Sequence, residues 1–169
     1  LNEGFAEYFA NFYMEKSHPD NIISNRRDVV EDITSLPYGS VKVDDVDNVN
    51  RIFSGRLSYN KGSYVVFMLR LVIGDDAFFA ALRSYFNDPT IRYGFARTPD
   101  MKRHLEQASG KNLDQYFRQW YEGEGYPSFH AEWTPLGATH VKLKMSQTTS
   151  HPSVSFYETP IPLLFKNNT

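Results

Sequence analysis

The sequence predicts an α+β protein that is mainly α-helical and ends in a few β-strands. The residues from Tyr64 to Ile73 are apolar almost all round, which is typical of a buried central helix. After Gly123–Pro127, apolar and polar residues alternate, which is the pattern of strands. At the start of the chain, aromatic side chains recur at the spacing of one helix face: Phe5, Tyr8, Phe9, Phe12 and Tyr13.

Turn residues divide the helical part into segments. Pro19 ends the first helix, because proline cannot continue a helix. Gly74 fits the end of the central helix, Asp75 fits the N-cap of the next one, and Thr98 before Pro99 fits the start of another. The polar, acidic stretch 38–55 is expected to be a loop. The helices are expected over residues 1–16, 26–36, 59–73, 76–87, 98–109 and 112–121.

The end of the chain predicts about three strands, around residues 129–133, 141–145 and 160–165. Three strands rarely complete a sandwich, so the sequence indicates that this part is cut short. Trp120 and Trp133 are expected to pack the helical part against the strands.

Composition excludes some classes of function. The 169 residues are 41% hydrophobic and 15% aromatic, which is enough for a substantial core. Eighteen basic and twenty acidic side chains give a net charge of -2, which disfavours a nucleic-acid partner. The chain has no cysteine, so disulfides and cysteine metal sites are excluded. No apolar run is long enough to span a bilayer, and nothing in the sequence decides the compartment.

Two polar residues stand at the edges of these apolar segments. Tyr59 lies just before the central helix, where its phenol can donate a hydrogen bond in a cleft or simply pack like most tyrosines. Gly62, at the start of that helix, lets another backbone or a ligand come close. Glu3 lies beside the first aromatic stripe, where a carboxylate is either solvated or a metal ligand. The residues alone favour the structural reading for both Glu3 and Tyr59.

The two stretches together carry a family resemblance. Asn-Glu-Gly-Phe-Ala-Glu-Tyr at 2–8, followed by Tyr-Asn-Lys-Gly at 59–62, resembles the zinc aminopeptidases of the aminopeptidase N and leukotriene hydrolase type. The likeness covers residues 1 to about 130. Further motifs occur in the same order as in that family: Met68–Arg70, Ile73–Phe78, Leu82–Tyr85, Ser109–Leu113, Phe117–Trp120 and Gly125–Pro127.

The resemblance implies a division of the chain and a chemistry. Residues 1–126 would be the helical C-terminal part of a thermolysin-like zinc peptidase domain, and residues 127–169 the start of a β-sandwich domain. The activity would be removal of N-terminal residues from peptides by a Zn²⁺-activated water. Glu3 matches the third zinc ligand, and Tyr59 matches the tyrosine that stabilises the oxyanion.

The sequence departs from the family pattern at the zinc helix. None of its five histidines begins a His-Glu-x-x-His motif, so two zinc ligands and the general base are absent. Asn60 stands where the family usually has Glu, and Ser54 where some members have another tyrosine. We therefore expect the isolated chain to be inactive and to hold no tightly bound zinc.

Two expectations concern partners, and one alternative function stays open. The abrupt start of the first helix indicates a fragment, so the missing N-terminal part of the same protein is an expected partner. Exposed apolar surface predicts self-association. The alternative is a non-catalytic helical module, or a degenerate relative, that binds peptide or carbohydrate.

Overall fold

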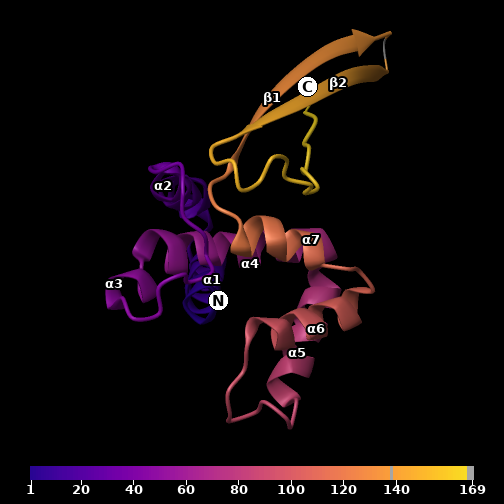
Figure 1. Cartoon of the computed structure of the whole chain (residues 1–169). Coiled ribbons are helices and arrows are strands. Elements are labelled where there is room, and N and C mark those ends of the chain that lie inside the picture. Colours follow the sequence, from indigo (N-terminus) through magenta and orange to yellow (C-terminus); the bar gives the residue numbers. More distant parts are fainter. Residues whose placement is uncertain (138, 167–169) are drawn as a thin grey trace.

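Helix α4 lies at the centre of the helical part of the computed structural model, which describes residues 1–137 and 139–166 (Figure 1). Helices precede a single β-hairpin, so the expected mainly helical α+β class is confirmed. The elements are α1 (Asn2–Ser17), the 3₁₀-helix η1 (Pro19–Asn21), α2 (Ile22–Thr34), α3 (Val49–Ile52), the π-helix η2 (Gly55–Lys61), α4 (Gly62–Ile73), α5 (Asp75–Asn87), α6 (Thr98–Ser109), α7 (Asp114–Tyr116), the π-helix η3 (Phe117–Glu122), β1 (Pro127–Leu136) and β2 (His140–Thr149).

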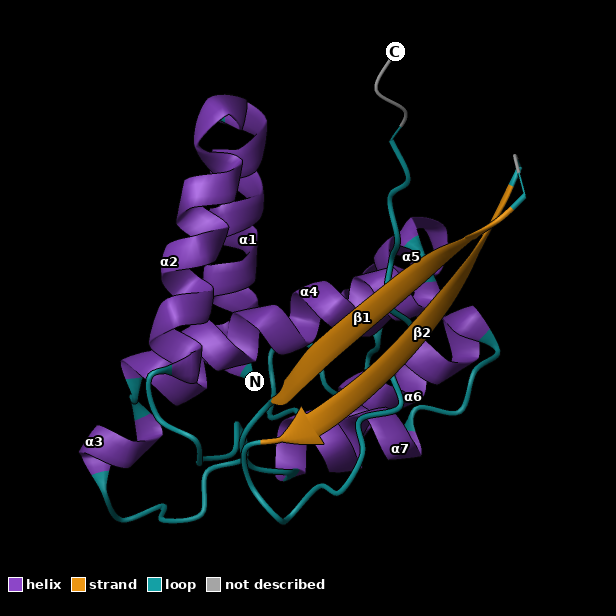
Figure 2. Cartoon of the chain, turned by 90° about the horizontal axis from the view of Figure 1, so that it is seen from above, coloured by secondary structure: helices purple, strands orange, loops and turns teal. Residues whose placement is uncertain are grey.

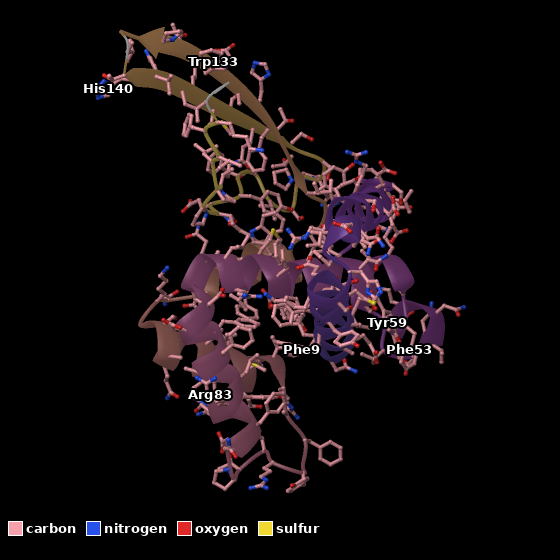
Figure 3. The ribbon with its side chains drawn as sticks, turned by 180° about the vertical axis from the view of Figure 1, so that it is seen from behind. Phe9, Phe53, Tyr59, Arg83, Trp133 and His140 are labelled. Atoms are coloured by element: carbon pink, nitrogen blue, oxygen red, sulfur yellow. The ribbon has the colours of Figure 1, made fainter. Side chains whose placement is uncertain are left out.

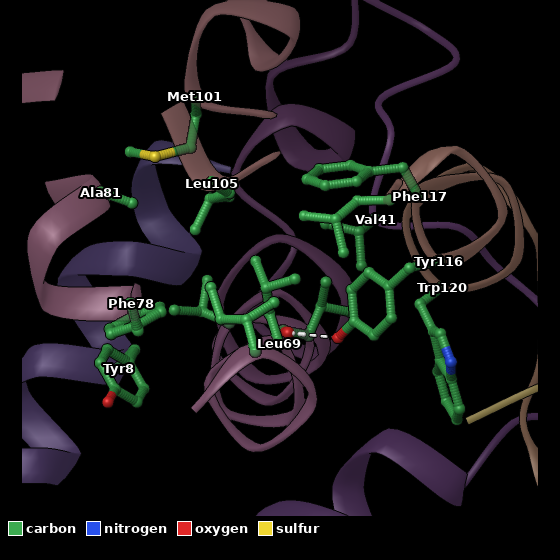
Figure 4. Packing of buried hydrophobic residues seen from close by; sticks show 14 of the residues in the cluster. Tyr8, Val41, Leu69, Phe78, Ala81, Met101, Leu105, Tyr116, Phe117 and Trp120 are labelled. Carbon is green, nitrogen blue, oxygen red and sulfur yellow. Dashed lines mark hydrogen bonds between the residues drawn. The ribbon is translucent and has the colours of Figure 1, made fainter. Parts of the chain in front are cut away.

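The core is built against α4, whose place as the buried central helix the apolar run predicts. Val65, Val66 and Leu69 are each 1% exposed. The Tyr116 hydroxyl donates a hydrogen bond of 2.5 Å to the Val65 carbonyl, so this buried phenol has a partner (Figure 4). Leu71 is 52% exposed, so burial all round the helix was too strong an expectation. The other residues packed there include Tyr8, Phe78, Ala81, Met101, Leu105, Phe117 and Trp120.

Helices α1 and α2 lie side by side (Figure 2). Glu15 of α1 and Arg26 of α2 form an ion pair of 2.6 Å. The Tyr64 hydroxyl of α4 donates to the Arg26 carbonyl at 2.9 Å, and the Arg26 guanidinium lies over the Phe67 ring. These contacts fasten α2 to both α1 and α4.

Two glycines end helices as expected. Gly74 has φ 86° and Gly110 has φ 66°, the left-handed region that favours glycine. The expectation that Asp75 is the N-cap of α5 is wrong. Gly74 occupies that position, and the Asp75 carboxylate instead pairs with Arg70 at 2.6 Å.

The start of α6 differs by one residue from the expectation. Thr98 is the first helical residue, and Arg97 is the N-cap. The Asp100 carboxylate accepts a hydrogen bond of 2.8 Å from the Arg97 backbone N–H, which satisfies a donor that the helix leaves free.

The region expected to be a loop, 38–55, contains the short helix α3. The Asn48 side chain accepts a hydrogen bond from the Arg51 N–H at 3.1 Å and so caps that turn. The single helix expected over 59–73 is two elements, η2 and α4. Within the described residues, no helix combines the length and apolar composition that crossing a bilayer requires.

The β-hairpin extends away from the helices (Figure 1). Its strands are antiparallel, with Trp133 opposite Leu143. Trp133 is 68% exposed, so the expectation that it packs on the helices is wrong. Trp120 packs on the segment after the hairpin and not on a strand, because its ring lies 4.4 Å from that of Tyr157. Residues 160–165 form no strand, which is a further correction, and the prolines at 160 and 162 have no N–H to donate to a ladder.

Candidate active site

Tyr59 lies on the π-helix η2, whose wide turn begins at Ser54. The Ser54 carbonyl accepts from the Ser58 N–H at 2.8 Å and from the Tyr59 N–H at 3.3 Å, and the latter bond spans five residues. The Ser54 hydroxyl accepts from the Leu57 N–H at 3.3 Å and closes the start of the turn. Such π-helical turns are rare and frequently occur at functional sites.

Glu3 reaches the same place because α1 crosses the start of α4 at two glycines. A Cβ built on Gly4 would lie 2.6 Å from the carbonyl carbon of Gly62, so the two backbones touch. The close approach expected at Gly62 is thereby confirmed, and the neighbour is a backbone of this chain. Glu3 and Tyr59 flank this contact on their respective helices. Figure 3 shows Tyr59 at the side of the helical part, away from Trp133 on the hairpin.

The charges of α1 act on the Tyr59 phenol. Its pKa is raised above the ordinary value, first by desolvation, then by the nearby carboxylate of Glu3 and the negative charge of Glu7. The phenol therefore remains protonated at neutral pH, as a hydrogen-bond donor. The structure brings together the two residues that the sequence singled out.

Glu7, which the sequence indicates to be an ordinary helix residue, also acts on the Tyr59 phenol. It lies one turn after Glu3 on α1, and its Oε1 accepts a hydrogen bond of 3.1 Å from Asn11. The spacing of four residues on a helix was the available signal, because it places both carboxylates on one face.

The Glu3 carboxylate is suited to a cation. It is partly buried, and its Oε1 accepts a hydrogen bond of 3.0 Å from the Asn2 amide. No ion pair among the described residues includes Glu3, so no side-chain cation neutralises it. Carboxylate oxygen is an ordinary zinc ligand.

The described residues contain no group of three His, Cys, Asp or Glu side chains that could hold a metal ion. His104 lies away from Glu3, between α5 and α6, where its ring nitrogens contact Ser84 at 2.9 Å and Asp88 at 3.0 Å. Glu3 is therefore a single carboxylate donor in this part of the chain.

Asn60 and Lys61, which follow Tyr59, hold η2 against its neighbours. The Asn60 amide donates to the Asp32 carboxylate at 2.7 Å. The Lys61 side chain is 4% exposed, and its Nζ donates to the Gly39 carbonyl at 2.7 Å and to the Gly123 carbonyl at 3.4 Å.

Comparison with known proteins shows the family to which the chain belongs. Residues 1–120 match the family model described as the peptidase family M1 domain. Aminopeptidase N of Lactococcus lactis subsp. lactis is 33% identical over 144 residues, covering 78% of this chain and 16% of that protein. The alanine/arginine aminopeptidase of Saccharomyces cerevisiae is 29% identical over 135 residues (75% and 15%), and aminopeptidase A of Gloydius brevicauda is 30% identical over 180 residues (98% and 18%).

These likenesses place the chain in the class of peptidases. It belongs to peptidase family M1. The chain spans about a sixth of the length of the relatives it matches.

Proposed function

We propose that this chain is part of the catalytic domain of a zinc aminopeptidase that removes N-terminal residues from peptides. Glu3 is the third zinc ligand in this proposal, and Tyr59 is the donor to the oxyanion. The observation that carries the proposal is the backbone contact between Gly4 and Gly62, which sets Glu3 beside Tyr59 in a chain of family M1.

A bound zinc would acidify a water molecule and polarise the peptide carbonyl. Glu3 supports such a site with an oxygen donor that no side-chain cation of the described residues pairs with. The two imidazole ligands and the general base would come from another part of the same protein. For this reason the isolated chain should neither hold zinc tightly nor hydrolyse peptides.

The role of Tyr59 follows from its protonation state. With its pKa raised, the phenol keeps its proton at neutral pH and donates a hydrogen bond from Oη. When water adds to the scissile carbonyl, negative charge collects on the carbonyl oxygen. A phenol that donates to that oxygen stabilises the charge and lowers the barrier.

The domain division belongs to the same proposal. Residues 1–126 are taken as the helical C-terminal part of the catalytic domain, and residues 127–169 as the start of a β-sandwich domain. The change from η3 to β1 supports a boundary there, since the helices end at Glu122 and the first strand begins at Pro127.

Glu3→Gln in the whole protein tests the proposal, with Glu7→Gln as a matched control one turn along the same helix. Metal analysis should find about one zinc per chain in the wild type and in Glu7→Gln, and much less in Glu3→Gln. Hydrolysis of an aminoacyl anilide should fall together with the zinc content. Full zinc content in Glu3→Gln, or an equal loss in Glu7→Gln, would refute the role of Glu3 as a ligand.

A wild-type whole protein that holds no zinc and cleaves no aminoacyl anilide would favour the alternative, a non-catalytic module that binds peptide or carbohydrate.

A further inference from the structure

Lys61, the last residue of η2, is a buried cation that the proposed chemistry leaves unused. Its Nζ donates to two backbone carbonyls, Gly39 at 2.7 Å and Gly123 at 3.4 Å. No ion pair of the described residues includes it.

An ammonium group in this position is costly for stability. The pKa of Lys61 is lowered to about 8, mainly by burial and also by the positive charges of Arg56 and Arg51, while the Glu124 carboxylate acts in the opposite direction. An apolar side chain of similar length would avoid this penalty. The lysine therefore has to be explained by what its ammonium holds in place.

Lys61 and Glu124 hold Gly39 from both sides. The Gly39 carbonyl accepts from Lys61, and the Gly39 N–H donates to the Glu124 carboxylate at 2.9 Å. Arg56, near the other end of η2, donates to the adjacent Tyr38 carbonyl at 3.0 Å. Both ends of η2 are thus tied to the same short loop.

Of the ties between η2 and this loop, the one at Lys61 lies closer to Tyr59 than the one at Arg56. The two residues are separated by a single position in the same wide turn. A shift of the end of the turn that Lys61 anchors would therefore move the Tyr59 side chain with it.

We propose that Lys61 is a positioning residue for Tyr59: its bonds to the Gly39 and Gly123 carbonyls hold the phenol in register with Glu3. The proposal rests on the proposed function for its effect on catalysis. It also links the site to the junction before the hairpin, because Gly123 is the residue that follows η3.

The kinetic test uses Lys61→Met in the whole protein, with Lys111→Met as the matched control. Lys111 also donates to a backbone carbonyl, that of Val72, but near the far end of α4. Misplacing a reacting group by about 1 Å costs on the order of 100-fold in rate. Lys61→Met should therefore lower kcat roughly 10- to 100-fold, keep KM within about threefold and retain zinc. Lys111→Met should leave kcat nearly unchanged.

A second measurement avoids any dependence on zinc. In this chain labelled with ¹³Cζ-tyrosine, the Tyr59 resonance is the one that disappears in Tyr59→Phe. It should shift with a midpoint near the pKa of Lys61, about 8, in the wild type and in Lys111→Met. In Lys61→Met that step should vanish, and the resonance should move or broaden at every pH.

The outcomes separate the two proposals. A Tyr59 resonance that is the same in Lys61→Met and wild type, or a kcat within about twofold of wild type, overturns the role of Lys61. A kcat loss matched by an equal loss in Lys111→Met also overturns it, since that result reflects general destabilisation. A whole protein without zinc or peptidase activity overturns the proposed function, while the resonance measurement still decides what Lys61 does to Tyr59.

Discussion

Gly4 and Gly62 meet backbone to backbone where α1 crosses the start of α4. A Cβ on Gly4 would lie within 2.9 Å of three backbone atoms of Gly62, whereas a Cβ on Gly62 would lie 3.0 Å from the Gly4 Cα. The crossing is closer than any residue with a side chain allows. The two positions therefore fix how near Glu3 comes to Tyr59.

Gly4→Ala should lower the free energy of unfolding by about 1–3 kcal/mol, because the added methyl group forces the two helices apart. Gly62→Ala should cost less, since its contact is longer. Gly55→Ala is the control, because a Cβ there meets nothing within 4 Å. Urea unfolding followed by circular dichroism measures all three. Equal free energies of unfolding for Gly4→Ala and Gly55→Ala would contradict the prediction, because the methyl group at Gly4 would then not force the helices apart.

Tyr59→Phe in the whole protein should lower kcat on the order of 100- to 1000-fold, because one donor to an oxyanion that forms only in the transition state is removed. KM should stay within a few fold and zinc should be retained, since neither depends on the phenol. Tyr13→Phe, at a position that is 69% exposed on α1, is the control. Steady-state kinetics on an aminoacyl anilide decides, and a kcat near wild type would remove Tyr59 from the mechanism.

The stability of the chain should depend on alkaline pH through Lys61. Its pKa is about 8 in the folded chain and about 10.5 in the unfolded one, so between these values the unfolded chain binds more protons. The free energy of unfolding contributed by Lys61 should rise with pH over this window, by at most about 1.4 kcal/mol per pH unit. The difference in unfolding free energy between wild type and Lys61→Met, measured from pH 7 to 10, isolates this term from the tyrosines. A difference that does not change with pH would contradict the prediction.

Asp88 should make the chain sensitive to acid. Its carboxylate accepts hydrogen bonds from Thr90, Arg103 and His104, and these hold its pKa well below the ordinary value. The resulting stability is present above the ordinary carboxylate pKa of 3.8 and is lost as the pH falls toward the folded-state value. Asp88→Asn should reduce stability at pH 7 and flatten the dependence below pH 4. Asp76→Asn, an exposed aspartate on α5, should change neither.

The hairpin should promote self-association of the isolated chain. Trp133 and Leu136 are 68% and 54% exposed, and Val141 and Phe129 are each 44% exposed. Such surfaces associate when they form a contiguous patch. Trp133→Lys should shift the concentration dependence of sedimentation toward the monomer, whereas Phe95→Lys, on the loop before α6, tests whether any exposed aromatic does the same. A wild-type chain that is monomeric at all concentrations would contradict the prediction.

The sequence predicted those features that depend on local chemistry. Gly74 and Gly110 end helices because no other residue adopts their backbone angles so easily. This preference is local, so the identity of the residue is enough to predict the helix end. The close approach at Gly62, which has ordinary helical angles, was predicted because glycine has no side chain to keep a neighbour away. Its partner, Gly4, was not, since nothing local in a sequence says which backbone will arrive there.

The remainder depended on tertiary contacts. Asp75 was expected to cap α5, but the Arg70 guanidinium, a charged partner five residues earlier, takes its carboxylate instead. The π-helix η2, which bears Tyr59, has only seven residues, and this is too short for a periodic pattern of apolar side chains to reveal it. The expected strand at 160–165 had apolar side chains, but a strand also needs a neighbour to pair with, and β1 pairs with β2 alone among the described residues.

The loop at Gly39 has a consequence for the order in which the chain folds. Its partners are remote: Glu124 is 85 positions further along, Tyr126 reaches back 92 positions to the Thr34 carbonyl, and Ser150 reaches back 113 to that of Pro37. Contacts this distant in sequence form late, because a long loop must close before they are made. Helices α1 and α4 and the π-helix η2 have most of their contacts with one another. The turn that bears Tyr59 can therefore join these helices first, and it takes its final orientation only when residues 124–150 reach the loop at Gly39.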